Sequence, residues 1–268
     1  MTQLTLTKHH GLGNDFLVVF HPDTADLPAL ARQLCDRRRG IGADGLLVGE
    51  SAEGYAAQMV LYNADGSRAE MSGNGIRCFA QALSMRRGNT HDQLILTDAG
   101  DRLVTISTTD EPDVIHASVD MGAVVEIAEP ADWHSIGADP LRPVRHLSLG
   151  NPHAVVGVDE VGAVDLLTLG GIVPYINLEI VESGPEPHAI TMRVHERGAG
   201  LTEACGTGAC ASAWAASEWG LVPASTEEIV VHMDGGDAKV RLHHPLPGRV
   251  TLIGPAQYVA TVIVDLDE

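Results

Sequence analysis

Residues 196–220 read E-R-G-A-G-L-T-E-A-C-G-T-G-A-C-A-S-A-W-A-A-S-E-W-G. Cys205 stands directly before Gly-Thr-Gly, and residues 208–219 are small or apolar and compatible with a helix. Gly220 supplies a left-handed stop, so the stretch predicts a buried helix whose first turn is 206–208. The free backbone N–H groups of that turn and the helix dipole would favour both a thiolate at Cys205 and a bound carboxylate. A cysteine at this position is therefore placed for chemistry.

The same arrangement occurs a second time, about half a chain earlier. Residues 72–88 read S-G-N-G-I-R-C-F-A-Q-A-L-S-M-R-R-G, which is again a small nucleophile-like residue, Gly-x-Gly, a helical run and a final glycine. Ser72 holds the place that Cys205 holds in the later copy. Because the helix and the residues that lead into it both occur twice, the sequence predicts a chain of two similar lobes.

The composition and net charge exclude some classes of binding partner and indicate the cell compartment. The chain has 268 residues, of which 44% are hydrophobic and only 4% aromatic, so the core must be built mainly from Val, Leu, Ile and Ala. The net charge of −19 argues against nucleic acid or an anionic membrane as partner, because both need a basic surface. The N-terminus lacks a signal-peptide pattern and no run of 18 apolar residues occurs, which predicts a cytoplasmic protein. The four cysteines lack C-x-x-C spacing and are interpreted as reduced thiols.

The pattern of elements predicts an α+β fold of two pseudo-symmetric lobes. Many short alternating segments read as strands, a helical segment at 27–39 ends in three arginines, and one buried helix falls in each half. The β-α-β rhythm of a doubly wound sheet is missing, so neither Gly-x-Gly is read as a dinucleotide fingerprint. The acidic run 110–113 lacks the spacing of a calcium loop and is read as a turn. We place the lobe boundary at the Pro- and Gly-rich segment after residue 120.

Two helix starts related by such symmetry suggest a specific chemistry. If they faced one another across a cleft between the lobes, one substrate could be held from both sides. Its α-carboxylate would then meet the first-turn N–H groups, which would stabilise the charge that develops when the α-proton leaves. Residues 72 and 205 would lie on opposite faces of the α-carbon. That geometry describes a two-base racemase or epimerase, in which one group removes the proton and the other returns one.

Five motifs together resemble the diaminopimelate epimerase family. They span the chain in the family's order and read H-G-L-G-N-D-F at 10–16, N-A-D-G-S at 63–67, S-G-N-G-I-R-C-F-A at 72–80, G-N-P-H-A-V-V at 150–156, and E-R-G-A-G-L-T-E-A-C-G-T-G-A-C-A at 196–211. The resemblance implies interconversion of LL- and meso-2,6-diaminopimelate on the route to lysine and peptidoglycan, without pyridoxal phosphate or a metal. It also implies lobes that are each a barrel-like sheet around a central helix, spanning 1–120 and 121–255. The last strand, 256–268, would return to the first lobe, and a homodimer is possible.

The resemblance also assigns residues. Cys205 matches one catalytic thiol, and Ser72 stands where the family has the other. His153 and Glu196 match residues that support the thiols. The residues matching the substrate-binding positions are Asn14, Asn63, Gly73, Asn74, Asn151, Asn177, Glu196, Arg197, Gly206 and Thr207. From the residues alone, the pattern at Asn14 and Asp15 favours turn chemistry over a substrate contact.

Two positions depart from the family pattern. Gly45 stands where many members have a substrate-contacting glutamine, and Ser72 replaces a cysteine. A thiol can ionise near neutral pH, whereas an aliphatic hydroxyl essentially does not, so Ser72 would be a poor base. Three explanations stay open: an introduced change at residue 72, a related racemase or dehydratase reaction that uses a Ser/Cys pair, or a weakened homologue. A catalytically silent amino-acid-binding protein is the alternative of a different class. Relatives that act as isomerases with a carboxylate base would need an acid at the helix start, and the sequence has none there.

Overall fold

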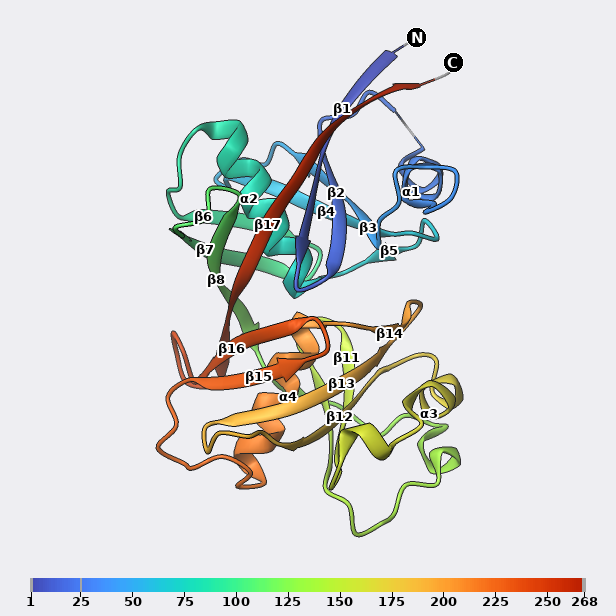
Figure 1. Ribbon diagram of the computed structural model, residues 1–268, viewed down its shortest axis with the longest axis vertical. Helices are drawn as coiled ribbons and strands as arrows, with labels where there is room; N and C mark the ends of the chain where they lie inside the picture. The colour runs from blue at the N-terminus through green and yellow to red at the C-terminus, as the bar shows by residue number, and fades with distance from the viewer. Residues whose placement is uncertain (1, 25, 267–268) are drawn as a thin grey trace. The chain divides into compact units, whose positions relative to one another are not determined.

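The computed structural model describes residues 2–24 and 26–266, which divide into two compact units (Figure 1). The first unit contains the chain up to Val119 together with the segment from Gly254 onward, and the second unit is Asp120–Ile253. Each unit is a strand-rich sheet with a buried helix at its centre, which confirms the predicted α+β class. We describe each unit by itself.

The first unit contains two helices and most of its strands in sequence order. Its elements are β1 (Thr2–Gly11), β2 (Asn14–Phe20), α1 (Leu27–Cys35), β3 (Gly45–Glu50), β4 (Ala57–Asn63), β5 (Arg68–Ala69), α2 (Gly73–Arg87), β6 (Gln93–Thr97), β7 (Gly100–Thr108) and the first part of β8 (Val114–Ala123), which continues into the second unit. The long final strand β17 (Arg249–Leu266) begins in the second unit and pairs with β1 in antiparallel register, with Leu6 opposite Val262.

The second unit repeats the plan. Its elements are β9 (Val125–Glu126), the 3-10 helix η1 (Trp133–Ile136), β10 (Val144–Ser148), β11 (Pro152–Gly157), the 3-10 helix η2 (Val161–Ala163), α3 (Leu166–Ile172), β12 (Asn177–Ser183), β13 (Ala189–Glu196), β14 (Gly200–Thr202), α4 (Gly206–Glu218), β15 (Ile229–Met233) and β16 (Gly236–Leu242).

Strand pairing shows the internal symmetry directly. In the first unit, β2 pairs in parallel with β3 after the α1 crossover, β3 pairs antiparallel with β4, and β4 pairs in parallel with β6 after α2. In the second unit, β11 pairs in parallel with β12 after α3, β12 pairs antiparallel with β13, and β13 pairs in parallel with β15 after α4. The short strands β5 and β14 precede the central helices in the same way. Helices α2 and α4 are therefore topological equivalents.

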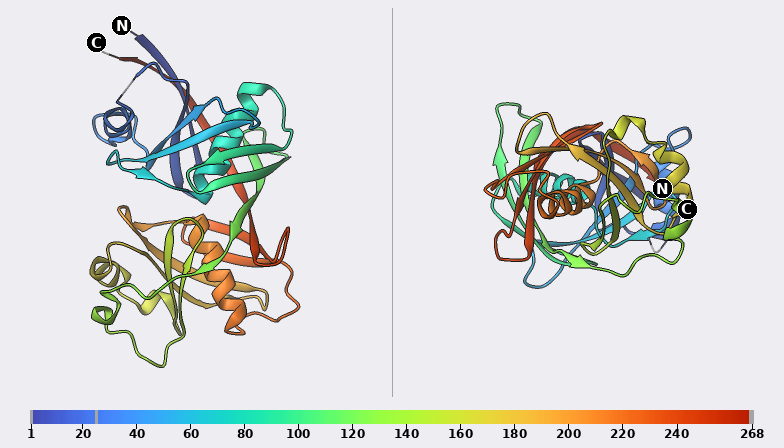
Figure 2. Two further views of the ribbon diagram at one scale, coloured as in Figure 1. Left: turned by 180° about the vertical axis from the view of Figure 1, so that it is seen from behind. Right: turned by 90° about the horizontal axis from the view of Figure 1, so that it is seen from below.

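The two central helices are buried because their sequences are small or apolar on every side. Residues 73–84 of α2 are all buried, and the Ala-rich α4 is buried over most of its length. Figure 2 shows α4 enclosed by the strands of its own unit. The predicted glycine stops are confirmed, since Gly88 and Gly220 adopt φ angles of +67° and +72°, which side chains with a Cβ rarely adopt.

Helices α1 and α3 pack on the faces of the sheets that α2 and α4 do not cover. Leu30 and Leu34 of α1 pack on Leu46 of β3, and Leu166 of α3 packs on Ile180 of β12. These strands are covered on both faces, which is why they read as continuous apolar runs instead of alternating ones.

Two helices differ from the prediction. Helix α1 ends at Cys35 and not in the arginine run, because Asp36 Oδ1 accepts the backbone N–H groups of Arg38 and Arg39 and turns the chain. Helix α3 was not expected, because its sequence L-L-T-L-G-G-I contains two glycines that lower helix propensity.

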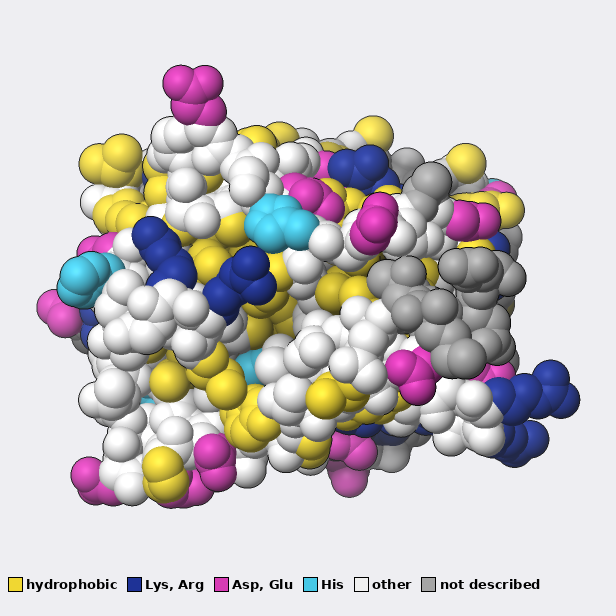
Figure 3. Space-filling view, turned by 90° about the horizontal axis from the view of Figure 1, so that it is seen from above, with side chains coloured by type: hydrophobic (Ala, Val, Ile, Leu, Met, Phe, Trp, Pro, Cys, Tyr) yellow, Lys and Arg dark blue, Asp and Glu magenta, His cyan; other side chains and the backbone are white. Residues whose placement is uncertain are grey.

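On the face seen in Figure 3, acidic side chains are spread widely and Lys and Arg side chains occur in small groups between them. Within the part of the chain that the structure describes, no helix is both long and apolar enough to cross a membrane.

Candidate active site

Cys205 is the N-cap residue of α4. Its backbone is extended (φ −127°, ψ 113°), its carbonyl accepts the first helical hydrogen bond from Ala209 N, and its Sγ accepts a hydrogen bond from Gly208 N at 3.3 Å. Thr207 Oγ1 lies 3.5 Å from the same sulfur. Only 4% of the Cys205 surface is exposed. In the second unit the thiol of Cys205 therefore lies at a helix start, as predicted.

A chain of hydrogen bonds runs from this helix start into strand β11. Asn151 Nδ2 donates to Thr207 Oγ1 at 3.1 Å, and His153 Nε2 lies 3.1 Å from Asn151 Oδ1. Asn151 is 8% exposed, and the other two side chains are also buried. The structure therefore brings Asn151, His153, Thr207 and Cys205 together.

The remaining predicted residues of the second unit lie at the adjacent ends of β12 and β13. Asn177 opens β12 next to His153 in the parallel ladder, and its Oδ1 accepts the backbone N–H of Arg197 at 2.8 Å. Glu196 closes β13, and its Oε1 accepts the hydroxyl of Thr202 at 2.5 Å. Because β12 and β13 are antiparallel, the start of β12 and the end of β13 lie at the same edge of the sheet, and Glu196 is close enough to affect the pKa of Cys205.

The electrostatic surroundings of Cys205 reverse one expectation. Burial, followed by the electrostatic effect of the nearby acids Glu196 and Glu179, raises the pKa of the Cys205 thiol well above its usual value. Hydrogen bonds from Thr207 and Gly208 act in the opposite direction but do not outweigh these effects. The hydrogen bond from Gly208 at the helix start thus favours the thiolate, but burial and the two acids shift the pKa of Cys205 in the opposite direction.

Glu179 is a buried acid that sequence reasoning missed. It lies in the middle of β12 with no surface exposed, and its Oε1 is 2.6 Å from His153 Nδ1. Its Oε2 makes no hydrogen bond to any residue that the structure describes. A signal was present in the sequence, because an ionisable residue inside the apolar strand N-L-E-I-V is costly unless it has a partner.

In the first unit, Ser72 occupies the position equivalent to Cys205. It is the N-cap of α2 with extended backbone (φ −139°, ψ 124°), and its Oγ accepts a hydrogen bond from Gly75 N at 3.0 Å. Asn74 in the first turn donates through Nδ2 to Asn14 Oδ1 at 3.2 Å. Ser72, Gly73, Asn74 and Asn14 are therefore brought together at the start of α2.

Asn63 and Gly45 lie at a neighbouring sheet edge. They are direct partners in the β3–β4 pairing, and Gly45 is also opposite Phe16 of β2. Asn63 Nδ2 donates a hydrogen bond to Ser67 Oγ within its own turn. A Cβ at position 45 would lie 2.8 Å from the Tyr62 carbonyl oxygen, so this backbone has no room for a larger residue there.

Two further groups in the first unit orient predicted residues and were also missed. Arg77 is fully buried, and its guanidinium donates to Asn74 Oδ1 at 2.8 Å and to Gly73 O at 3.0 Å. Asp44 Oδ2 accepts from Asn14 Nδ2 at 2.7 Å. An arginine within an otherwise buried helix was the sequence signal for the first group.

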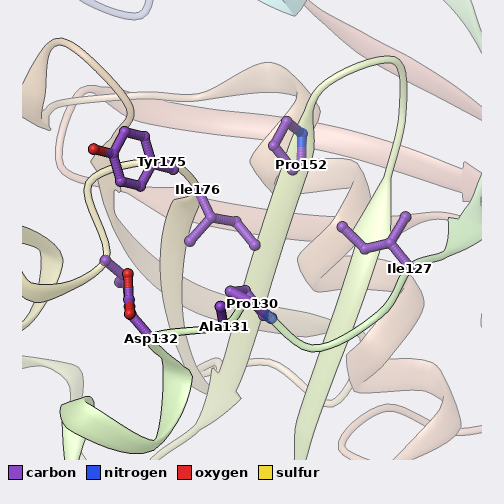
Figure 4. A pocket seen from close by; sticks show the side chains of 8 residues that line it. Ile127, Pro130, Ala131, Asp132, Pro152, Tyr175 and Ile176 are labelled. Carbon is purple, nitrogen blue, oxygen red and sulfur yellow. The ribbon is translucent and has the colours of Figure 1, made fainter.

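A pocket in the second unit lies apart from these residues. It has a volume of about 300 Å³, and Figure 4 shows seven of its lining residues: Ile127, Pro130, Ala131, Asp132, Pro152, Tyr175 and Ile176. Pro152 and His153 are consecutive in β11 and point to opposite faces of the sheet. The pocket therefore belongs to the outer face of the strand and contains none of the predicted site residues. Among the described residues, no group of three or more His, Cys, Asp or Glu side chains is placed to hold a metal ion.

Comparison with known proteins decides the family. The model of the family "Diaminopimelate epimerase" matches residues 6–127 and 146–259. The chain belongs to the diaminopimelate epimerase family. It is 36% identical to the diaminopimelate epimerase of Halothermothrix orenii over 99% of both chains, and 35% identical to that of Geobacillus kaustophilus over 97% of this chain and 96% of that protein. As a member of the family it is an isomerase of the racemase and epimerase class.

Solved structures show that the fold is shared more widely. A predicted epimerase from Pseudomonas aeruginosa has a TM-score of 0.77 at 15% identity and covers 98% of this chain and 100% of that one. A hydroxyproline epimerase from Agrobacterium vitis has a TM-score of 0.71 at 15% identity, covering 99% and 93%. At these identities the likeness establishes the fold alone, and it confirms the predicted fold class of this epimerase-family chain.

Proposed function

We propose that this protein epimerises LL-2,6-diaminopimelate to meso-2,6-diaminopimelate, in the supply of lysine and peptidoglycan precursors, by direct proton transfer at the α-carbon. Cys205 is the thiol that exchanges a proton with one face of the α-carbon. Residue 72 serves the opposite face, where Ser72 makes that half of the reaction slow. The substrate is a small amino acid. We propose that the reaction takes place in the cytoplasm.

The observation that carries the proposal is the equivalence of the two helix starts. Cys205 and Ser72 cap topologically equivalent helices, and each is followed by a first turn whose N–H groups suit a carboxylate. A two-base reaction needs two such positions, and the family to which the chain belongs supports assigning them to diaminopimelate.

The distribution of lysines supports direct proton transfer over Schiff-base chemistry. The chain has two lysines, Lys8 and Lys239. Lys8 forms an ion pair with Asp15 at 2.8 Å, and Lys239 forms one with Glu228 at 2.9 Å. Both lysines are therefore engaged in ion pairs with acids outside the predicted site, and we assign proton transfer in the second unit to Cys205.

Within the second unit, Glu196, Arg197 and Asn177 would recognise the end of the substrate that does not react. Glu196 supplies a carboxylate for an ammonium group, and Arg197 supplies a guanidinium for a carboxylate. A monoamino acid such as proline lacks this second end. We therefore expect it to be a poor substrate.

The test is conversion of LL-diaminopimelate followed by chiral chromatography, with L-proline as a second substrate. We expect slow formation of the meso isomer by the natural chain, none by the Cys205→Ser variant, and no racemisation of proline. Racemisation of proline, or complete inertness of correctly folded natural and Ser72→Cys proteins towards diaminopimelate, would show that the substrate assignment is wrong. Binding of diaminopimelate with no turnover by either protein would instead favour a silent binding protein.

A further inference from the structure

We propose that Glu179 is a positioning residue for Cys205: together with His153 it holds a shared proton, and through Asn151 and Thr207 it fixes the direction of a hydrogen bond to the sulfur. The inference rests on the proposed function of Cys205 as a proton-transferring thiol. It concerns residues of the second unit only, and it assigns a task to an acid that the family motifs do not include.

The first step is the isolation of the Glu179–His153 pair from water. Both side chains are 0% exposed, and their contact of 2.6 Å is at the short end of the hydrogen-bond range. An unpaired carboxylate would be strongly disfavoured in such a place. The two groups therefore act as one unit.

The second step is the position of the protons. Asn151 Nδ2 donates to Thr207 Oγ1, which leaves Asn151 Oδ1 facing His153 Nε2. An amide oxygen only accepts, so Nε2 must carry a hydrogen. The short contact between His153 Nδ1 and Glu179 Oε1 then needs one further proton between them, as imidazolium with carboxylate or as imidazole with carboxylic acid. In both forms the pair has no net charge.

The third step leads to the sulfur. Because Thr207 Oγ1 accepts its hydrogen bond from Asn151, its own hydrogen is left to point at Cys205 Sγ, 3.5 Å away. Gly208 N is a second donor to the same atom at 3.3 Å. Donors directed at a sulfur stabilise its thiolate form. If the pair lost its shared proton, His153 Nε2 would accept, Asn151 would turn, and the Thr207 hydrogen would be drawn away from Cys205.

The fourth step is proximity. A Cβ built on Gly208 would lie 2.7 Å from Glu179 Oε1 and 3.2 Å from Cys205 Sγ, so the acid and the thiol border the same residue of α4. A second acid, Glu196, is also close enough to raise the pKa of Cys205. A neutral Glu179–His153 pair avoids placing a second full negative charge beside the thiolate that forms during proton transfer.

The test measures the thiol itself and needs no substrate. Alkylation of Cys205 by iodoacetamide is followed by mass spectrometry as a function of pH, in the natural chain and in the Glu179→Leu and Glu179→Gln variants. A glutamine amide can donate to His153 Nδ1, which keeps the hydrogen on Nε2 and leaves the direction of each hydrogen bond from His153 to Cys205 unchanged. Leucine has no such donor. We expect Glu179→Leu to slow alkylation about tenfold below the pKa of Cys205, as loss of one hydrogen bond to a charged group would do, and Glu179→Gln to stay within about threefold.

Thr207→Val is the second variant. It removes the hydroxyl that donates to Cys205 Sγ and changes the side-chain volume little. It should slow alkylation as much as Glu179→Leu, and the double variant should be no slower than either one. The buried Cys35, Cys78 and Cys210 serve as internal references for unfolding. Equal rates in Glu179→Leu and the natural chain, equal losses in the leucine and glutamine variants, or additive losses in the double variant would each overturn the proposal. Failure of the diaminopimelate assay alone would leave these thiol measurements standing.

Discussion

Ser72 and Cys205 hold the same position in the two halves of the chain. Each is the N-cap of a central helix in extended backbone, and the side chain of each accepts a hydrogen bond from the amide three residues further on. The two residues are equivalent in position but not in chemistry, because the Ser72 hydroxyl does not ionise in the pH range where the Cys205 thiol can. The two halves are therefore expected to differ in rate by a large factor.

The Ser72→Cys variant should restore a matched pair. A competent general acid or base contributes about 10²–10⁴-fold to a rate, so kcat/KM for diaminopimelate should rise within roughly that range. The change should cost about 1 kcal/mol or less of stability, since a cap is weakened and not removed. The comparison variant is Ser72→Ala, which cannot transfer a proton. A folded Ser72→Cys protein no faster than Ser72→Ala would mean that residue 72 takes no part in the reaction.

The crowded start of α4 predicts a contrast between two glycines. An alanine Cβ at 208 would come within 2.7 Å of Glu179 Oε1, whereas at Gly171, in helix α3, it would meet nothing within 4 Å. Gly208→Ala should therefore lower the free energy of unfolding by about 1–3 kcal/mol. Gly171→Ala should raise it by about 0.5–1 kcal/mol, because alanine is the better helix former. Urea denaturation measures both. Equal changes in the two variants would show that the close approach of Glu179 to α4 is absent.

Buried His9 should make stability depend on pH. Burial lowers its pKa from 6.5 to about 4, against a weaker opposing effect of the hydrogen bond to Gln81. Between those pH values the unfolded imidazole binds a proton and the folded one does not, so stability is lost as pH falls. The free energy of unfolding should drop by about 3 kcal/mol between pH 7 and pH 4 from this residue alone.

Urea denaturation at a series of pH values tests this effect of His9. The His9→Phe variant should be less stable at pH 7 but should have a flatter pH dependence, whereas His116→Gln, at an exposed position of β8, should leave the slope unchanged. If the His9→Phe and natural proteins lose stability in parallel as pH falls, His9 is not the group responsible.

The elements that sequence patterns could predict were those with strong local signals. The helices α2 and α4 were predicted together with their caps and glycine stops, because capping residues, small side chains and Gly88 or Gly220 all indicate the same boundaries. Helix α1 was extended too far because Arg37 looked like a charged helix end, whereas it pairs with Asp15 and Asp44 in the folded unit.

The contacts that orient the site could not be predicted, because they depend on pairings between distant strands. His153 and Glu179 meet only because β11 and β12 pair in parallel across α3. A parallel register has no local sequence signature of the kind that a tight hairpin has. The direction of the Cys205 pKa shift was missed for the same reason, since it depends on burial and on acids supplied by two other strands.

The most direct test of the central claim is α-proton exchange in D2O, measured by NMR separately from LL- and from meso-diaminopimelate. If Cys205 is the working base and Ser72 the weak one, the natural protein should exchange the α-proton of one isomer much faster than that of the other. Ser72→Cys should remove the difference, and Cys205→Ser should abolish the fast exchange. Equal exchange from both isomers by the natural protein, or fast exchange that survives Cys205→Ser, would contradict the account.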